Sequence, residues 1–196
     1  STERVLVHES VADDLIGRLK AKVDGFVTGD PREQVHIAHV ESKRSADRIL
    51  AMVRDAEEKG AKAITEYQVN GTAISPILLD GIAPGMQLYT EESFGPVCTL
   101  ERVKDDEEAI AKANYSVFGL SAAVFSRDLG RAMAVAQRIE SGICHINSAT
   151  VDDEAPMPFG GVKESGYGRF GSNASINEFT ELRWITVRST PKHYPI

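Results

Sequence analysis

Apolar and polar side chains alternate along the chain with two different periods, which predict strands and helices in turn. Residues 3–7 contain apolar side chains bounded by charged ones and predict a strand. Ser10 suits a helix N-cap, and apolar residues then recur at helical spacing as far as residue 26. The stripe predicted to be buried consists of Val11, Leu15, Leu19, Val23 and Phe26.

The alternation continues to residue 147. A second helix is expected over residues 41–59, ended by Gly60, and its buried stripe comprises Ala46, Ile49, Leu50 and Val53. Two shorter helices are predicted over residues 104–113 and after the cap Asp128, the latter with one apolar face of Leu129, Ala132, Met133, Ala136 and Ile139. A tight turn is expected at Asn70-Gly71. Further strands are predicted over residues 61–65, 75–79, 97–103, 120–125 (largely buried), 143–146 and 182–187.

Strands that alternate with helices are typical of an α/β fold. The expected architecture is a mainly parallel, twisted sheet with flanking helices. In such sheets ligands bind beyond the carboxyl ends of the strands, so a site is expected at that edge. The loop over residues 151–174 is long for a compact domain, and loops of this length are usually functional or disordered.

Composition narrows the class of protein. The 196 residues are 42% hydrophobic with a net charge of −7, which suits one globular domain with a small appendage. An acidic chain offers no broad basic face, so we expect no nucleic-acid partner. No apolar run approaches the roughly 18 to 20 residues that span a bilayer, so no membrane partner is expected. The start has no signal-peptide pattern and there are two cysteines, which predicts a cytoplasmic location.

The segment from Glu91 to Val97 is the first candidate for chemistry. The Glu92 carboxylate could accept hydrogen bonds from two adjacent sugar hydroxyls, and the Phe94 ring could contact a flat heterocycle. The alternative interpretation is an exposed acidic turn with one core phenylalanine, and composition alone favours it.

Two other segments attract a functional interpretation. The glycine-rich run 157–171 lacks both phosphate-loop and dinucleotide-loop spacing, so it is either a ligand-facing loop or a packed structural loop. Cys144 beside His145 suggests a nucleophile and its base, as in a cysteine hydrolase. Neighbours in a strand point to opposite faces, however, so Cys144 and Cys98 are better explained as small buried residues. His36 and His39 have no third ligand in the sequence, so no metal site is predicted.

Five segments, in order, resemble motifs of the aldehyde dehydrogenase superfamily. They are E-E-x-F-G-P-V at 91–97, N-x-x-x-Y/F-G-L-x-A at 114–122, G-x-x-x-x-N at 142–147, P-F-G-G-x-K-x-S-G-x-G-R-x-G at 158–171, and the closing strand at 178–187. Residues 152–158, 179–184 and 193–196 most resemble the salicylaldehyde, vanillin and benzaldehyde dehydrogenase group. Ala38-His39 departs from the Gly-Pro pair of many members, which puts that turn in doubt.

The resemblance implies the catalytic-domain fold of that family and NAD(P)-dependent oxidation of an aromatic, salicylaldehyde-like aldehyde through a cysteine thiohemiacetal. The family's nucleophilic cysteine, general-base glutamate and Rossmann domain lie upstream of the matching stretch. No catalytic residue is therefore assigned here, and this chain alone is expected to be inactive. By the same resemblance Glu92 binds the nicotinamide ribose and Phe94 packs against the nicotinamide. Phe159 lines the aldehyde pocket, with Val151 and Asp153 as further walls.

The resemblance also divides the chain into two parts. Residues 1–178 would form the catalytic α/β domain, and residues 179–196 an oligomerisation strand and tail that adds to a partner's sheet in a homo-oligomer. The alternative is a folded non-enzymatic module that oligomerises. Whether the cofactor is NAD or NADP stays open, because the selecting residues lie outside the matched motifs.

Overall fold

A four-stranded sheet forms the centre of the computed structural model, which describes residues 2–195. Its strands, in spatial order, are β1 (Arg4–His8), β6 (Val97–Val103), β5 (Ile77–Asp80) and β2 (Lys62–Ala63). The first three run parallel, and β2 is antiparallel to β5. The prediction of a mainly parallel sheet in an α/β fold is confirmed.

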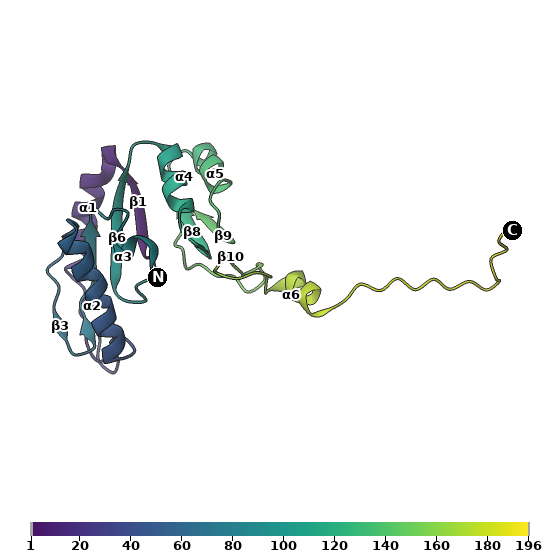
Figure 1. Ribbon diagram of the computed structural model, residues 1–196, viewed down its shortest axis with the longest axis horizontal. Helices are drawn as coiled ribbons and strands as arrows, with labels where there is room; N and C mark the ends of the chain where they lie inside the picture. Colours follow the sequence, from purple (N-terminus) through teal and green to yellow (C-terminus); the bar gives the residue numbers. More distant parts are fainter. Residues whose placement is uncertain (1, 196) are drawn as a thin grey trace.

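Helices pack on both faces of this sheet (Figure 1). α2 (Lys43–Glu58) shares one hydrophobic cluster with Ile77 and Leu79 of β5. α1 (Glu9–Val23) shares a second cluster with Leu78 of the same strand. Because successive side chains of a strand point to opposite faces, β5 contributes to both layers of the core.

The predicted stripe of α1 is wrong at its start. The N-cap is His8, whose Nδ1 accepts a hydrogen bond from the backbone N–H of Ser10, so Ser10 lies inside the helix. Ala12 and Ile16 are buried, whereas Val11 is exposed. Each step of four residues turns about 40° beyond one full turn of the helix. Successive residues at that spacing therefore rotate away from the buried side, which leaves Val11 exposed.

Two short segments connect strands of this sheet along the chain. The hairpin of β3 (Val69–Asn70) and β4 (Ala73–Ile74) confirms the predicted tight turn, with Gly71 at φ +64°. The one-turn helix α3 (Gln87–Thr90) precedes the segment that the motif analysis singled out.

A second group of elements follows α4 (Asp106–Asn114), whose N-cap Asp105 accepts a hydrogen bond from the N–H of Glu108. β8 (Ser121–Val124) and β9 (Ile143–Ile146) pair in parallel. β10 (Val162–Lys163) pairs antiparallel to β7 (Phe118–Gly119). Asp128 caps α5 (Leu129–Ala136) as predicted.

Burial in this second group was predicted wrongly. Leu129 and Met133 of α5 are exposed, and so are Leu120 and Phe125 around β8. The β8–β9 sheet has only two strands, which offer α5 a narrow surface to cover. Of the predicted α5 face, Ala132 is the residue that is buried.

The C-terminal part also differs from prediction. Residues 172–179 form a helix that was not expected, α6 (Ser172–Phe179). Beyond it the chain extends away from the body (Figure 1). Residues 182–187 do not form the predicted strand within the described chain, because a strand needs a hydrogen-bonded neighbour. Ser1 and Ile196, the outer limits of the two predicted parts, lie outside the described residues.

Within residues 2–195, no helix has both the length and the apolar character needed to span a membrane.

Candidate functional site

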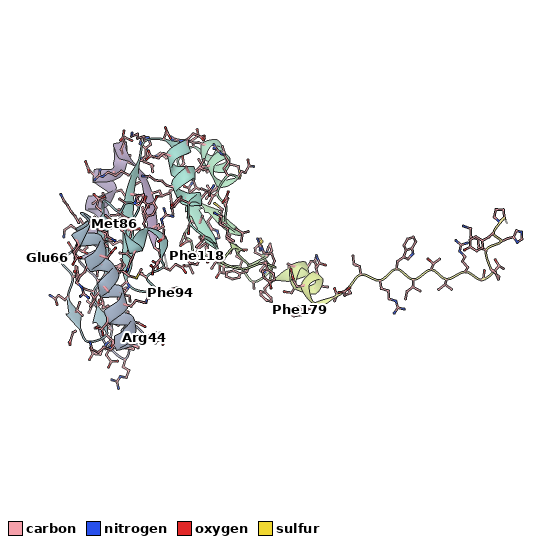
Figure 2. All side chains as sticks on the ribbon, viewed as in Figure 1. Arg44, Glu66, Met86, Phe94, Phe118 and Phe179 are labelled. Atoms are coloured by element: carbon pink, nitrogen blue, oxygen red, sulfur yellow. The ribbon has the colours of Figure 1, made fainter. Side chains whose placement is uncertain are left out.

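The segment with Glu92 and Phe94 lies between α3 and β6, at the amino end of that strand. Glu3 directly precedes the parallel neighbour β1, so it lies at the same edge of the sheet. In Figure 2 the labelled Phe94 lies at this end, where Figure 1 marks the N-terminus. Glu92 and Phe94 therefore lie at the amino edge of the central sheet, not at the expected carboxyl edge.

The turn from Glu92 to Gly95 has a specific and constrained backbone. Ser93 is fully buried, and its Oγ accepts a hydrogen bond from the N–H of Gly95 at 3.2 Å. Phe94 has φ +48°, a left-handed conformation that is strained for a residue with a Cβ. A Cβ on Gly95 would lie 2.5 Å from Cδ1 of Ile49, so α2 packs directly against the turn.

The two side chains of interest project from this turn. The Phe94 ring is 78% exposed, so the alternative interpretation of a core phenylalanine is wrong. Glu92 is exposed, and its backbone carbonyl, rather than its carboxylate, takes part in the hydrogen bonds of the described chain. Partial burial and the nearby Glu3 carboxylate raise the pKa of Glu92. An exposed ring and a free carboxylate two positions apart can contact a heterocycle and neighbouring hydroxyls.

Two charged side chains contact the backbone of the turn. The Glu3 carboxylate accepts hydrogen bonds from Ser93 and Phe94, and the Arg48 guanidinium donates to the carbonyls of Glu92 and Ser93. Sequence reasoning missed both residues. They lie far from the turn along the chain and belong to no local motif, so only the fold brings them there.

The residues predicted to line an aldehyde pocket are only partly brought to this turn. Val151 follows Thr150, whose hydroxyl lies 2.8 Å from that of Thr2, next to Glu3. Asp153 and Phe159 are exposed, and no hydrogen bond or ion pair of the described residues joins either one to the Glu92 turn. Phe159 instead pairs through its backbone with Phe170, at 2.7 and 2.8 Å.

The glycine-rich loop is held by its own polar side chains. Lys163 Nζ donates to the carbonyls of Asn114 and Ser116, and Arg169 Nη1 donates to those of Gly161 and Gly168. A Cβ on Gly142 would lie 1.8 Å from the carbonyl oxygen of Gly160, so the loop packs tightly on the strand end. These contacts favour the packed structural loop over a loop whose polar groups face a ligand.

The two cysteines lack the features of a nucleophile. Burial raises the pKa of Cys98 to about 11 and also raises the pKa of Cys144 above its ordinary value. Cys144 and His145 are successive residues of β9, so their side chains point to opposite faces. The described residues contain no group of three or more histidine, cysteine or acidic side chains arranged to hold a metal ion.

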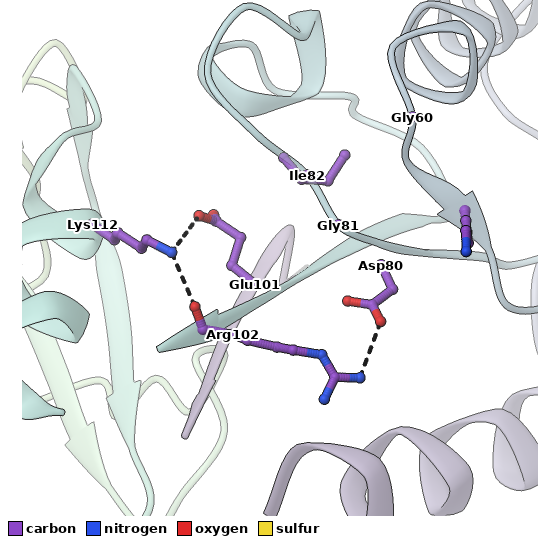
Figure 3. A pocket seen from close by; sticks show the side chains of 8 residues that line it. Gly60, Asp80, Gly81, Ile82, Glu101, Arg102 and Lys112 are labelled. Atoms are coloured by element: carbon purple, nitrogen blue, oxygen red, sulfur yellow. Dashed lines mark hydrogen bonds and ion pairs between the residues drawn. The ribbon is translucent and has the colours of Figure 1, made fainter. Parts of the chain in front are cut away.

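A shallow pocket lies at the opposite, carboxyl edge of the sheet (Figure 3). Four of its charged side chains form pairs. Arg102 contacts Asp80 at 3.3 Å, and Lys112 lies 3.9 Å from the buried Glu101. Lys62 also lines the pocket, so the three positive and two negative side chains neutralise each other only in part.

Comparison with known proteins gives a consistent result. A model of the aldehyde dehydrogenase family matches residues 1–185. Vanillin dehydrogenase of Pseudomonas fluorescens is 52% identical over the whole chain, which covers 41% of that protein. The crystal structure of a salicylaldehyde dehydrogenase from Pseudomonas putida G7, complexed with salicylaldehyde, superposes with TM-score 0.93 at 41% identity, over 99% of this chain and 40% of that one.

A third similar structure is a complex with a nucleotide. It is the NADP-dependent glyceraldehyde-3-phosphate dehydrogenase from Bacillus halodurans C-125, complexed with NADP, with TM-score 0.86 at 39% identity. It covers 89% of this chain and 37% of that one. The chain thus spans about two fifths of the length of the relatives that it matches.

Proposed function

This chain belongs to the aldehyde dehydrogenase family, and from that premise we propose that it is the C-terminal catalytic portion of an NAD(P)-dependent aldehyde dehydrogenase. The proposed reaction oxidises an aldehyde, aromatic in character, to its carboxylic acid. The observation that carries the proposal is the exposed Phe94 ring, held on a rigid turn two residues after the free carboxylate of Glu92.

The turn has groups that fit a nicotinamide nucleotide. When bound, NAD(P) supplies the hydride acceptor for the oxidation. Glu92 would accept hydrogen bonds from the hydroxyls of the ribose, and Phe94 would pack against the ring and restrict its orientation. Fixing that orientation matters because hydride transfer requires close and aligned reactants.

The proposed substrate is an aromatic aldehyde such as salicylaldehyde or vanillin. Its support is the similarity to the two dehydrogenases named for those compounds. Phe159 would line the pocket and Val151 and Asp153 would form further walls. In the described chain these residues are exposed, so they are free to face a ligand or another part of the enzyme.

The partner proposal concerns the C-terminal segment. We propose residues 1–178 as the catalytic part and residues 179–196 as a strand and tail that add to the sheet of a second copy, in a cytoplasmic homo-oligomer. Its support is a run of exposed apolar side chains, namely Phe179, Leu182, Trp184, Ile185 and Val187. The same run supports the second candidate, a non-enzymatic module that oligomerises.

A chimera tests the enzymatic proposal. This chain would replace the matching two fifths of the Pseudomonas fluorescens vanillin dehydrogenase, and NAD and NADP reduction would be followed with vanillin and salicylaldehyde. We expect turnover by the chimera and none by the chain alone. A folded chimera that reduces neither nucleotide would refute the proposal. Nucleotide reduction by the chain alone would refute the expectation that it is inactive.

A further inference from the structure

The Glu3 carboxylate contacts one side of the turn at three points. Oε2 accepts a hydrogen bond from the N–H of Ser93 at 2.8 Å. Oε1 accepts one from the Ser93 hydroxyl at 3.1 Å and one from the N–H of Phe94 at 3.0 Å. Hydrogen bonds to an ionised acceptor are stronger than neutral ones. Glu3 therefore fixes two successive backbone amides of the turn.

The Arg48 guanidinium contacts the carbonyl groups of the same turn. Nη1 donates to the carbonyl of Glu92 at 3.2 Å, and Nη2 donates to that of Ser93. The planar guanidinium suits two neighbouring carbonyls, which a lysine ammonium would reach less well. The turn is thus held by a carboxylate that accepts from its N–H groups and by a guanidinium that donates to its C=O groups.

The side chain of Phe94 cannot fix its own position. Its ring is 78% exposed, so little packing opposes its movement, and its φ of +48° is an unfavourable conformation. A strained turn persists only where surrounding contacts hold it, and here those contacts come from Glu3, Arg48 and Ile49.

We propose that Glu3 and Arg48 are positioning residues that hold the Glu92–Phe94 turn in the shape that presents its carboxylate and ring to the nicotinamide nucleotide. This inference rests on the proposed function, because it names what sets the geometry of the same site. Both side chains bond the turn itself, so each is proposed to act through the backbone of the turn.

The first test uses the chain itself and needs no activity. Amide exchange would be measured by NMR in Glu3→Gln and Arg48→Lys, with Glu58→Gln and Arg44→Lys as matched controls at exposed positions. Glutamine keeps one acceptor oxygen but loses the charge and the second acceptor. We expect exchange of the Ser93 and Phe94 amides to rise about tenfold in Glu3→Gln. Unchanged exchange at both amides would overturn the positioning role, whether or not the chimera is active.

The second test uses the chimera with the same four substitutions. We expect Glu3→Gln and Arg48→Lys to raise KM for NAD about tenfold and leave KM for the aldehyde unchanged, because each loosens a charge-assisted contact. A slower hydride step would also enlarge the isotope effect seen when the aldehyde hydrogen is replaced by deuterium. If Glu3 and Arg48 had only a structural role, their substitution would lower the urea midpoint and leave KM for NAD and the isotope effect unchanged.

The outcomes separate the two proposals. If the unsubstituted chimera turns over and the variants keep its KM for NAD and its isotope effect, the positioning role is wrong and the proposed function stands. If the folded, unsubstituted chimera reduces no nucleotide, the proposed function fails and the positioning role fails with it.

Discussion

The Thr2 hydroxyl lies 2.8 Å from the Thr150 hydroxyl and so joins the start of β1 to the loop after β9. The next residue, Glu3, contacts the turn at Phe94. Two adjacent residues thus connect the segment proposed to bind the nucleotide with the segment proposed to bind the aldehyde.

We expect Thr150→Val to loosen the second segment without unfolding the protein. Valine has nearly the same shape but cannot form the hydroxyl contact, while the Thr150 carbonyl still accepts its bond from Ser121. The contact is exposed, so the free energy of unfolding should fall by about 1 kcal/mol or less. Amide exchange at Val151 should increase, and KM for the aldehyde should rise in the chimera. Thr190→Val in the tail is the control, and equal exchange at Val151 in both variants would contradict the prediction.

Phe94→Leu should weaken nucleotide binding and leave stability unchanged. Leucine has the same Cβ as phenylalanine, so the strain of the turn is kept while the aromatic face is lost. Because the ring is exposed, the free energy of unfolding should change by no more than about 0.5 kcal/mol. Phe125→Leu is a matched control, since that ring is 70% exposed and lies near β8. A loss of NAD affinity of similar size in both chimeras would argue against a specific contact.

Gly95→Ala should destabilise the protein through α2. The added methyl group would lie 2.5 Å from Cδ1 of Ile49 and 3.0 Å from its Cγ1. Ile49→Val removes Cδ1, so the double variant should lose less stability than the sum of the two single variants. We expect urea unfolding to give a coupling free energy of about 1 kcal/mol, in the direction that makes the double variant more stable than the sum of the two single effects. Additive effects would show that the turn and α2 do not press on each other.

The features predicted correctly from the sequence are those that short-range patterns determine. Side-chain alternation predicted strand β6, a capping residue predicted the helix start at Asp128, and Asn70-Gly71 predicted the hairpin. Each of these depends on a few neighbouring residues. The motif around Glu92 and Phe94 was also readable, because its residues are nearly adjacent.

Burial and distant contacts could not be predicted in this way. The exposure of Leu129 and Phe125 depends on how many strands lie beneath them, which no local pattern records. Glu3 contacts Phe94 across 91 positions of sequence, and no local pattern indicates that contact. Helix α6 could not be predicted because none of residues 172–179 is buried, so no apolar stripe at helical spacing marks the helix.

Cys98 should make the protein less stable at alkaline pH. Burial, and secondarily the Glu3 carboxylate, raise the pKa of Cys98 from 9.0 to about 11. Above pH 9 the unfolded chain therefore releases this proton while the folded chain retains it, so stability falls as pH rises toward 11. The loss should be up to about 2 kcal/mol. In Cys98→Ala the decline over this range should be shallower than in the unsubstituted chain, as measured by urea unfolding at each pH. Cys144→Ala is the comparison, and equal slopes in both variants would contradict the assignment.

Trp184 offers a direct readout of the proposed association of the C-terminal segment. It is the single tryptophan of the chain and is 93% exposed in one copy, so its emission in the monomer should lie at long wavelength. If residues 182–187 add to the sheet of a second copy, the ring becomes buried and emission should shift to shorter wavelength as concentration rises. Leu182→Lys should suppress this shift, because a charge would have to be buried with the strand, whereas Thr190→Lys should not. Light scattering on the same samples would report the mass. A monomer whose emission is constant over the whole concentration range would rule out self-association through this segment and with it the oligomerising module.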